Sequence, residues 1–261
     1  MTRVVSGAVL LVVAVAVVWF VPSAVFAVAA EGLLVLAFIE YAALARASGV
    51  AVPATAAGVA TALTAAAFTH LVAVSLDTVL ISGFVALAAI TMPRWRGGND
   101  ALAIVAAAVL PMFYLGLSIG ALIGIRELRG REALALLMLT IIVSDTAQYY
   151  SGRLLGRHLL APVISPKKTV EGAVGGFVFG SAFAAVAGAW WLPAAPFALR
   201  ALVGATIVAL GIAGDLFESM LKRSAGVKDS STLIPGHGGV LDRIDALLFA
   251  APVYYVVLKW V

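Results

Sequence analysis

The chain has 261 residues, of which 63% are apolar and only 11% are charged, and its mean hydropathy is +1.11. A soluble globular domain carries about 25% charged residues, so this composition excludes one and predicts a membrane protein. The net charge of +4 accompanies no nucleic-acid-binding motif, so no nucleic-acid partner is expected. Cysteine is absent, which excludes disulfides, thiolate metal ligands and cysteine nucleophiles.

Apolar stretches long enough to cross a bilayer recur along the whole chain, since a transmembrane helix needs about 20 mostly apolar residues. They predict an all-α, polytopic membrane helical bundle with about nine transmembrane helices. The expected spans are 5–21, 23–45, 51–66, 70–91, 101–123, 133–151, 172–191, 199–221 and 244–261. The first span runs directly into the next without a small-residue cleavage site, so no cleaved signal peptide is expected.

The orientation follows from the positive residues, because lysine and arginine are retained on the cytoplasmic side of a membrane. With the N-terminus inside, most of the 17 lysines and arginines face the cytoplasm. Arg126, Arg129 and Arg131 are an exception, although Glu127 and Glu132 accompany them. We therefore expect a cytoplasmic N-terminus.

The two halves of the chain differ in polar content. We interpret residues 1–122 as a scaffold of transmembrane helices, with dimer contacts left open and no role assigned to Glu31, Glu40 or Asp77. We interpret residues 123–261 as the catalytic region, because three polar clusters interrupt its apolar helices. These clusters are residues 144–172, 214–223 and 228–250. All three fall on the cytoplasmic side of the expected topology, which places the predicted active site there.

The third cluster combines acidic and basic residues with a glycine-rich run. Asp242 and Asp245 are three residues apart at the start of the last expected helix, so their carboxylates project from one face. Such hard oxygen ligands suit Mg²⁺. The preceding "PGHGG" allows backbone N–H groups to approach an anion closely, and Lys228 and Arg243 add positive charge. The alternative is a glycine-rich loop that ends in a charged helix cap.

The second cluster adds Asp215 as a third metal ligand. This carboxylate lies in an apolar span, where an ionised group without a partner is costly, and a bound cation would remove that cost. Glu218 and Lys222 are four residues apart, so an intrahelical pair is the simpler explanation for them. His237 is either a phosphate contact or a plain loop residue, and metal ligation by a lone histidine beside carboxylates is the least favoured option.

The first cluster contains Asp145 and Tyr149 on one helical face and two adjacent lysines, Lys167 and Lys168. Pro166 precedes the lysines and cannot donate a backbone hydrogen bond, so a turn is expected before them. Lysine binds phosphate as a point charge, and basic loops also attract anionic lipid head groups. The alternative is that these lysines only enforce the topology.

The segment from Ser219 to Asp245, "SMLKRSAGVKDSSTLIPGHGGVLDRID", resembles the signature of the CDP-diacylglycerol synthase family, the integral membrane phosphatidate cytidylyltransferases. We call residues 219–245 the signature segment. "ISPKKTVEG" and "DTAQYYSGRLLG" are similar to two further motifs of the family, as are "RVVSG" and the Glu40-Tyr41 pair. The chain departs from the usual pattern at Gln148, where a small residue is common, and at Ser231-Thr232, which replace Gly-Asn.

The resemblance implies that CTP and phosphatidate react to give CDP-diacylglycerol and pyrophosphate in a bacterial inner membrane, and that the reaction requires Mg²⁺. A second cation and a homodimer are left open. The implied catalytic residues are Asp215, Lys222, Arg223, Lys228, Asp242, Arg243 and Asp245, with the three aspartates around the metal. The expected substrate-binding residues are Asp145, Lys167, Lys168, Ser219, Asp229, Gly236, His237, Gly238 and Gly239.

Two other functions are compatible with parts of the pattern. A CTP-dependent lipid kinase of the polyprenol type would also bind CTP in a membrane, but it needs a general base beside the acceptor hydroxyl. A transporter would place its buried carboxylates near the bilayer midplane between repeated halves, whereas no internal repeat is evident in this sequence.

Overall fold

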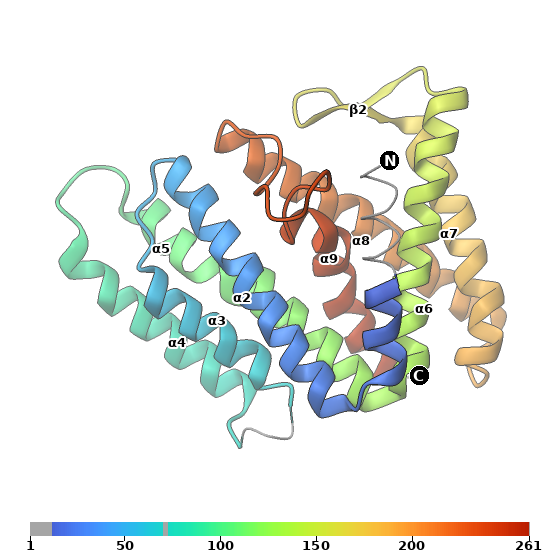
Figure 1. The fold of residues 1–261 in the computed structure, drawn as a ribbon, viewed down its shortest axis with the longest axis horizontal. Coiled ribbons are helices and arrows are strands. Elements are labelled where there is room, and N and C mark those ends of the chain that lie inside the picture. Colours follow the sequence, from blue (N-terminus) through green and yellow to red (C-terminus); the bar gives the residue numbers. More distant parts are fainter. Residues whose placement is uncertain (1–11, 70–72, 261) are drawn as a thin grey trace. The chain divides into compact units, whose positions relative to one another are not determined.

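The computed structural model describes residues 12–69 and 73–260, and these residues form helices joined by loops and one small β-hairpin (Figure 1). The elements are α2 (Ser23–Ala47), α3 (Ala54–Ala66), α4 (Leu76–Thr91), η1 (Met92–Arg94), α5 (Ala101–Pro111), η2 (Met112–Gly116), α6 (Leu117–Leu155), β1 (Leu159–Ala161), β2 (Ser165–Thr169), α7 (Val170–Trp191), α8 (Phe197–Ser224) and α9 (Leu241–Leu258).

Five helical segments in the described part of the chain are long and apolar enough to cross a membrane. They are Ser23–Ala47, Leu76–Arg94, Ala101–Leu155, Val170–Trp191 and Phe197–Ser224. The chain is therefore an integral membrane protein with an all-α architecture, as predicted. The first expected span, 5–21, begins outside the described residues, and residues 12–20 are helical.

The chain divides into two compact units. Unit 1 comprises residues 1–124 and 221–243, and unit 2 comprises residues 125–220 and 244–261. Residues 221–243, which hold most of the signature segment, thus pack with the N-terminal helices.

In unit 1, α3 packs against α2, α4 and η2 (Figure 1). Pro111 at the end of α5 has no backbone N–H, so the carbonyl of Ala107 lacks its usual helical partner. The hydroxyl of Tyr41 on α2 donates a hydrogen bond to this carbonyl at 2.8 Å. Within a membrane such a carbonyl needs an internal partner, so the proline links α5 to α2. The π-helical turn η2 follows directly after the proline.

In unit 2, the long helix α6 is interrupted at Gly130, which has φ 79° and ψ −175°. This left-handed conformation suits glycine because it has no Cβ. The break falls between the predicted spans 101–123 and 133–151. Beside it, the guanidinium of Arg129 donates two hydrogen bonds, of 3.2 and 3.0 Å, to the carbonyl of Leu258 near the end of α9. A cation at a helix C-terminus also stabilises the helix dipole.

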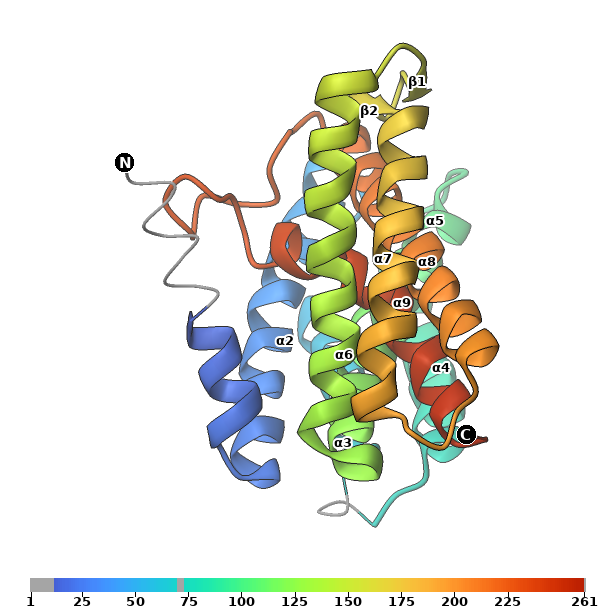
Figure 2. The ribbon, with the colours of Figure 1, turned by 90° about the vertical axis from the view of Figure 1, so that its right-hand side faces the viewer.

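Glycines allow α7 to lie close to the last turns of α6 in unit 2 (Figures 1 and 2). A Cβ on Gly176 would overlap Gln148 and Ser144, and one on Gly180 would lie 3.0 Å from the Cβ of Ser144. Small residues at such a spacing are typical of tightly packed membrane helices.

The hairpin β1–β2 connects α6 to α7 in unit 2. Its strands are antiparallel, with Leu159 opposite Thr169 and Ala161 opposite Ser165. Residues 162–164 form the turn, which confirms a turn before the two lysines, although the lysines themselves lie on β2. Thr169 caps α7 by accepting a 3.1 Å hydrogen bond from the N–H of Gly172.

Candidate functional site

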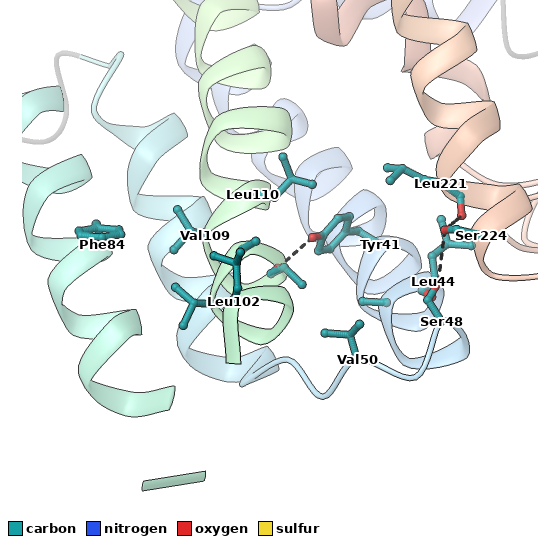
Figure 3. Close-up of a pocket in the computed structure, with 14 residues that line it drawn as sticks. Tyr41, Leu44, Ser48, Val50, Phe84, Leu102, Val109, Leu110, Leu221 and Ser224 are labelled. Carbon is teal, nitrogen blue, oxygen red and sulfur yellow. Dashed lines mark hydrogen bonds between the residues drawn. The ribbon is translucent and has the colours of Figure 1, made fainter. Parts of the chain in front are cut away.

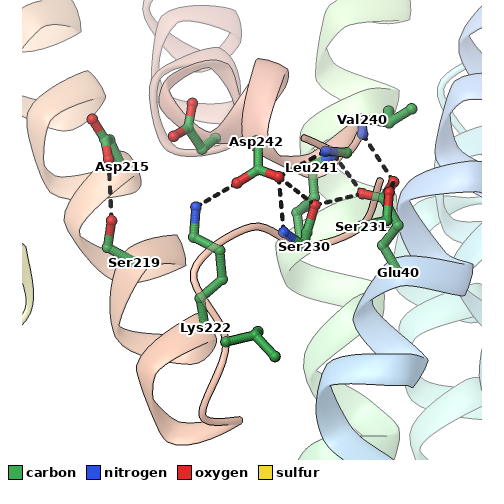
Figure 4. A network of polar contacts seen from close by, with 12 residues as sticks. Glu40, Asp215, Ser219, Lys222, Ser230, Ser231, Val240, Leu241 and Asp242 are labelled. Carbon is green, nitrogen blue, oxygen red and sulfur yellow. Dashed lines mark hydrogen bonds and ion pairs between the residues drawn. The ribbon is translucent and has the colours of Figure 1, made fainter. Parts of the chain in front are cut away.

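Asp242, in the first turn of α9, is the centre of a polar network in unit 1 (Figure 4). Its Oδ1 lies 2.5 Å from the ammonium of Lys222. Its Oδ2 accepts hydrogen bonds from the N–H of Ser230 (2.8 Å), the hydroxyl of Ser230 (2.7 Å) and the N–H of Gly239 (2.8 Å). The two oxygens therefore have different partners, since one faces a cation and the other faces neutral donors of the loop.

Asp242 and Lys222 are both buried, with 9% and 8% of their surface exposed. Burial alone raises the pKa of the Asp242 carboxyl, but hydrogen bonds from Lys222, Gly239 and Ser230 outweigh it and lower the pKa below the ordinary value. The carboxylate is therefore ionised at neutral pH. Lys222 forms an ion pair with Asp242, and the Glu218–Lys222 pair that the sequence also suggested stays a prediction.

The glycine-rich run before α9 forms a tight turn. The N–H of His237 donates to the carbonyl of Ile234 at 2.9 Å, and Gly236 between them has φ 77°. Proline second and glycine third in the turn are typical of type II. Gly238 also has a positive φ of 75°, and a Cβ there would lie 2.6 Å from the Oδ2 of Asp242. The N–H groups of His237 and Gly239 thus serve the internal structure, while phosphate binding by this run stays a prediction.

Glu40 of α2 joins this network from the other end of the sequence (Figure 4). It is 5% exposed, and its carboxylate accepts hydrogen bonds from the hydroxyls of Ser230 and Ser231 and from the N–H groups of Val240 and Leu241. The sequence indicated an acidic residue near the end of an apolar span, in a Glu40-Tyr41 pair that is similar to the family, but no role for it. Its partners, about 190 residues away in the chain, were not predictable from local pattern.

The other charged residues that the sequence predicted for the site and that lie in unit 1 are exposed. They are Arg223, Lys228, Asp229 and Arg243. The guanidinium of Arg223 donates to the carbonyl of Val227 at 2.8 Å, close to the end of α8. The three basic side chains among them are accessible to a soluble anion such as a nucleotide.

A second acid–base pair lies within unit 2. Lys168 on β2 forms an ion pair with Asp215 on α8, and the hydroxyl of Ser219 lies 3.4 Å from the other oxygen of Asp215. Lys168 and Asp215 are half-buried, whereas Lys167 is exposed. The structure thus brings the first and second polar clusters of the sequence together and distinguishes between the two adjacent lysines.

Asp145 occupies an exposed position on α6 in unit 2 and accepts a 3.0 Å hydrogen bond from the amide of Gln148. Gln148, the departure noted above, therefore contacts this predicted substrate-binding residue directly. Nearby, Glu171 in the first turn of α7 accepts hydrogen bonds from the N–H groups of Arg157 and His158. These bonds fix the start of the hairpin that carries Lys168.

The metal site predicted from the sequence remains a prediction. Within residues 12–69 and 73–260, no group of three or more histidine, aspartate or glutamate side chains is arranged to hold a metal ion. Asp215 and Asp242 each present a carboxylate oxygen to a lysine ammonium, and carboxylate oxygens are the ligands that Mg²⁺ prefers. The donor chemistry therefore fits a cation. Asp245, half-buried on α9, accepts a 2.8 Å hydrogen bond from the N–H of Ala246.

Unit 1 also contains an apolar cavity of about 560 Å³ (Figure 3). Its walls come from α2, α4, α5 and the end of α8, and include Tyr41, Phe84, Leu102, Ala106, Leu221 and Ser224. Ser48 and Ser224, whose hydroxyl oxygens are 3.5 Å apart, supply polar groups to the wall. This volume lies within the range of roughly 300–1,000 Å³ that is usual for small-molecule sites.

The model of the cytidylyltransferase family matches residues 1–261. The chain belongs to the cytidylyltransferase family. This membership confirms the resemblance that the signature segment indicated.

Curated relatives of this cytidylyltransferase-family chain include several proteins named phosphatidate cytidylyltransferase. That of Helicobacter pylori J99 is 40% identical over 151 residues, covering 58% of this chain and 56% of the relative. That of Aquifex aeolicus is 40% identical over 149 residues, covering 56% and 54%. That of Synechocystis is 52% identical over 120 residues, covering 45% and 40%. The chain thus aligns with about half the length of these relatives.

Proposed function

We propose that this chain transfers a cytidylyl group from CTP to phosphatidate, giving CDP-diacylglycerol and pyrophosphate in phospholipid biosynthesis. The observation that carries the proposal is the buried Lys222–Asp242 pair within the signature segment of a chain that belongs to the cytidylyltransferase family. The names of its curated relatives supply the substrate class.

In this reaction a phosphate oxygen of phosphatidate attacks the α-phosphorus of CTP. A new P–O bond forms, the bond from the α-phosphorus to the bridging oxygen breaks, and pyrophosphate leaves with the electron pair. A phosphate monoester has its second pKa near 6, so the attacking oxygen is already ionised at pH 7 and no general base is needed. The protein must instead compensate charge and align the two substrates.

The side chains of unit 1 suit this task in different ways. Asp242 holds the Lys222 ammonium in a fixed buried position, so the cation costs little reorganisation when a phosphate arrives. Arg223, Lys228 and Arg243 are exposed and would attract the triphosphate and stabilise the departing pyrophosphate. In unit 2, Lys168 is held by Asp215 in the same manner, and it would contact a phosphate as well.

We further propose that Mg²⁺ is held by Asp215, Asp242 and Asp245. Bound there, it would neutralise charge on the phosphates of CTP and phosphatidate.

The finer topology is also part of the proposal. Nine transmembrane helices with a cytoplasmic N-terminus would leave most arginines and lysines inside, as the distribution of positive residues favours. The polar clusters would then face the cytoplasm, where CTP is available, in the inner membrane of a bacterium. The proposed partners are CTP, phosphatidate and membrane lipids, and a homodimer stays a prediction.

We assign the apolar cavity of unit 1 to an acyl chain of phosphatidate. Its lining is mostly hydrophobic, and two of its wall residues, Leu221 and Ser224, flank the basic pair Lys222-Arg223 on α8. An amphiphile with a phosphate head group and an apolar tail matches this combination of a hydrophobic cavity and adjacent cations.

The test is an assay with purified full-length chain, Mg²⁺, phosphatidate and CTP labelled either at the α-phosphate or in the cytosine ring. We expect both labels in the lipid product and release of unlabelled pyrophosphate. A parallel reaction with a polyprenol and γ-labelled CTP examines the kinase alternative. Transfer of the γ-phosphate to the polyprenol, without cytidine in any lipid, would overturn the proposal.

A further inference from the structure

Glu40 is a buried acidic residue that accepts hydrogen bonds from the segment before and at the start of α9. Its Oε1 accepts from the hydroxyl of Ser231 at 2.6 Å and from the N–H of Val240 at 2.9 Å. Its Oε2 accepts from the hydroxyl of Ser230 at 2.8 Å and from the N–H of Leu241 at 2.8 Å. Each oxygen therefore lies within hydrogen-bond distance of two donor groups, and all four residues belong to unit 1.

This arrangement requires a carboxylate. The N-terminus of a helix carries a partial positive charge and N–H groups without helical partners, so it favours an anion. Glu40 provides that anion to α9, in a place where the sequence suggested a substrate phosphate. A glutamine would present an NH₂ group, which cannot accept a hydrogen bond, to a backbone N–H and a hydroxyl. The substitution Glu40→Gln therefore breaks the pattern although it preserves the shape of the side chain.

Ser230 connects Glu40 to Asp242. Its hydroxyl oxygen lies 2.8 Å from the Oε2 of Glu40 and 2.7 Å from the Oδ2 of Asp242. A hydroxyl carries one proton and can serve only one carboxylate at a time, so the two carboxylates compete for it. A Cβ on Gly239 would overlap both the Ser230 hydroxyl and the Glu40 carboxylate, which shows how closely the loop packs around Glu40.

We propose that Glu40 is a positioning residue, which fixes the conformation of residues 230–241 and, through Ser230, sets the hydrogen bonding of Asp242. Its effect on turnover rests on the proposed function. Its effect on the loop does not, and it can be measured without turnover.

The first test is hydrogen–deuterium exchange of the purified full-length chain in detergent micelles. Peptides that cover residues 229–241 should exchange roughly tenfold to hundredfold faster in Glu40→Gln, the factor expected for loss of one hydrogen bond to a charged group. Glu40→Asp keeps the charge and should restore part of the protection. Glu31→Gln, on the same helix α2, is the matched control and should exchange as the unchanged chain does.

The second test is kinetic. Glu40→Gln should lower kcat by about tenfold or more, and Glu40→Asp should recover part of this loss. Because the effects of coupled residues are not additive, Ser230→Ala should lower kcat less in the Glu40→Gln background than it does alone. Unchanged exchange at 229–241, uniformly faster exchange throughout unit 1, or additive kinetic losses would each overturn the positioning role. Absence of cytidylyltransferase activity in the chain without substitutions would overturn the proposed function instead. The hydrogen–deuterium exchange of residues 229–241 would still decide the role of Glu40.

Discussion

Replacing Asp242 with asparagine separates the catalytic and structural contributions of the carboxylate. The Asp242–Lys222 pair has an N–O distance of 2.5 Å, and both residues are at least nine-tenths buried. Removing one partner of a buried ion pair costs about 3–5 kcal/mol. We therefore expect Asp242→Asn to lower the thermal stability of the chain in addition to its turnover.

The expected loss of turnover is about 100- to 1,000-fold in kcat, the range for removal of one preorganised electrostatic group. Pyrophosphate release from CTP and phosphatidate in excess Mg²⁺ measures it, and thermal unfolding in the same detergent measures stability. The double variant Lys222→Met/Asp242→Asn removes the lysine charge as well, so it should recover most of the stability and none of the activity. Wild-type kcat in purified Asp242→Asn, or activity regained in the double variant, would refute the reasoning.

Two further predictions compare neighbouring residues. Lys168→Ala should reduce kcat at least tenfold because it removes the ion-pair partner of the half-buried Asp215. Lys167→Ala changes an exposed lysine and should reduce kcat less. Equal losses of kcat in the same pyrophosphate assay would contradict this difference. Ala106→Phe narrows the apolar cavity, and forcing extra methylenes into a filled site costs roughly 1–3 kcal/mol. The variant should therefore prefer short-chain over long-chain phosphatidate as substrate by about fivefold or more. Ala103→Phe on the same helix, outside the cavity lining, is the control, and the same chain-length preference in both variants would refute the assignment.

Hydropathy predicted the helices well because a membrane requires long apolar segments with internally bonded backbones. The expected spans 23–45, 172–191 and 199–221 correspond closely to α2, α7 and α8. The π-helical turn and the β-hairpin were not predicted from hydropathy, because each depends on single residues and their packing. The π-helical turn follows Pro111, and the hairpin before α7 contains only eight strand residues, which is too short for an alternating pattern to be recognised.

The signature segment shows why the chemistry of a site is only partly readable from its sequence. The sequence predicted a bound cation beside Asp215, because a buried carboxylate in a membrane needs a partner, but it did not identify the lysines that pair with the aspartates in the structure, Lys168 with Asp215 and Lys222 with Asp242. The sequence could not show which donors the glycine-rich run leaves for a ligand. A run of glycines fits an anion-binding nest and a type II turn equally well.

Backbone hydrogen bonds to Asp242 and Glu40 bear on this choice only at the end of the run, because Gly239 is its last residue and Val240 and Leu241 follow it. Once the N–H groups of Val240 and Leu241 bond to Glu40, and that of Gly239 bonds to Asp242, the start of α9 already holds two carboxylates. A phosphate at that position would meet negative charge and no available donor from these three groups. The glycines therefore allow the chain to wrap closely around its own carboxylates. We expect lysine and arginine side chains to recognise a phosphate here, and phosphate binding by the remaining N–H groups of the run stays a prediction.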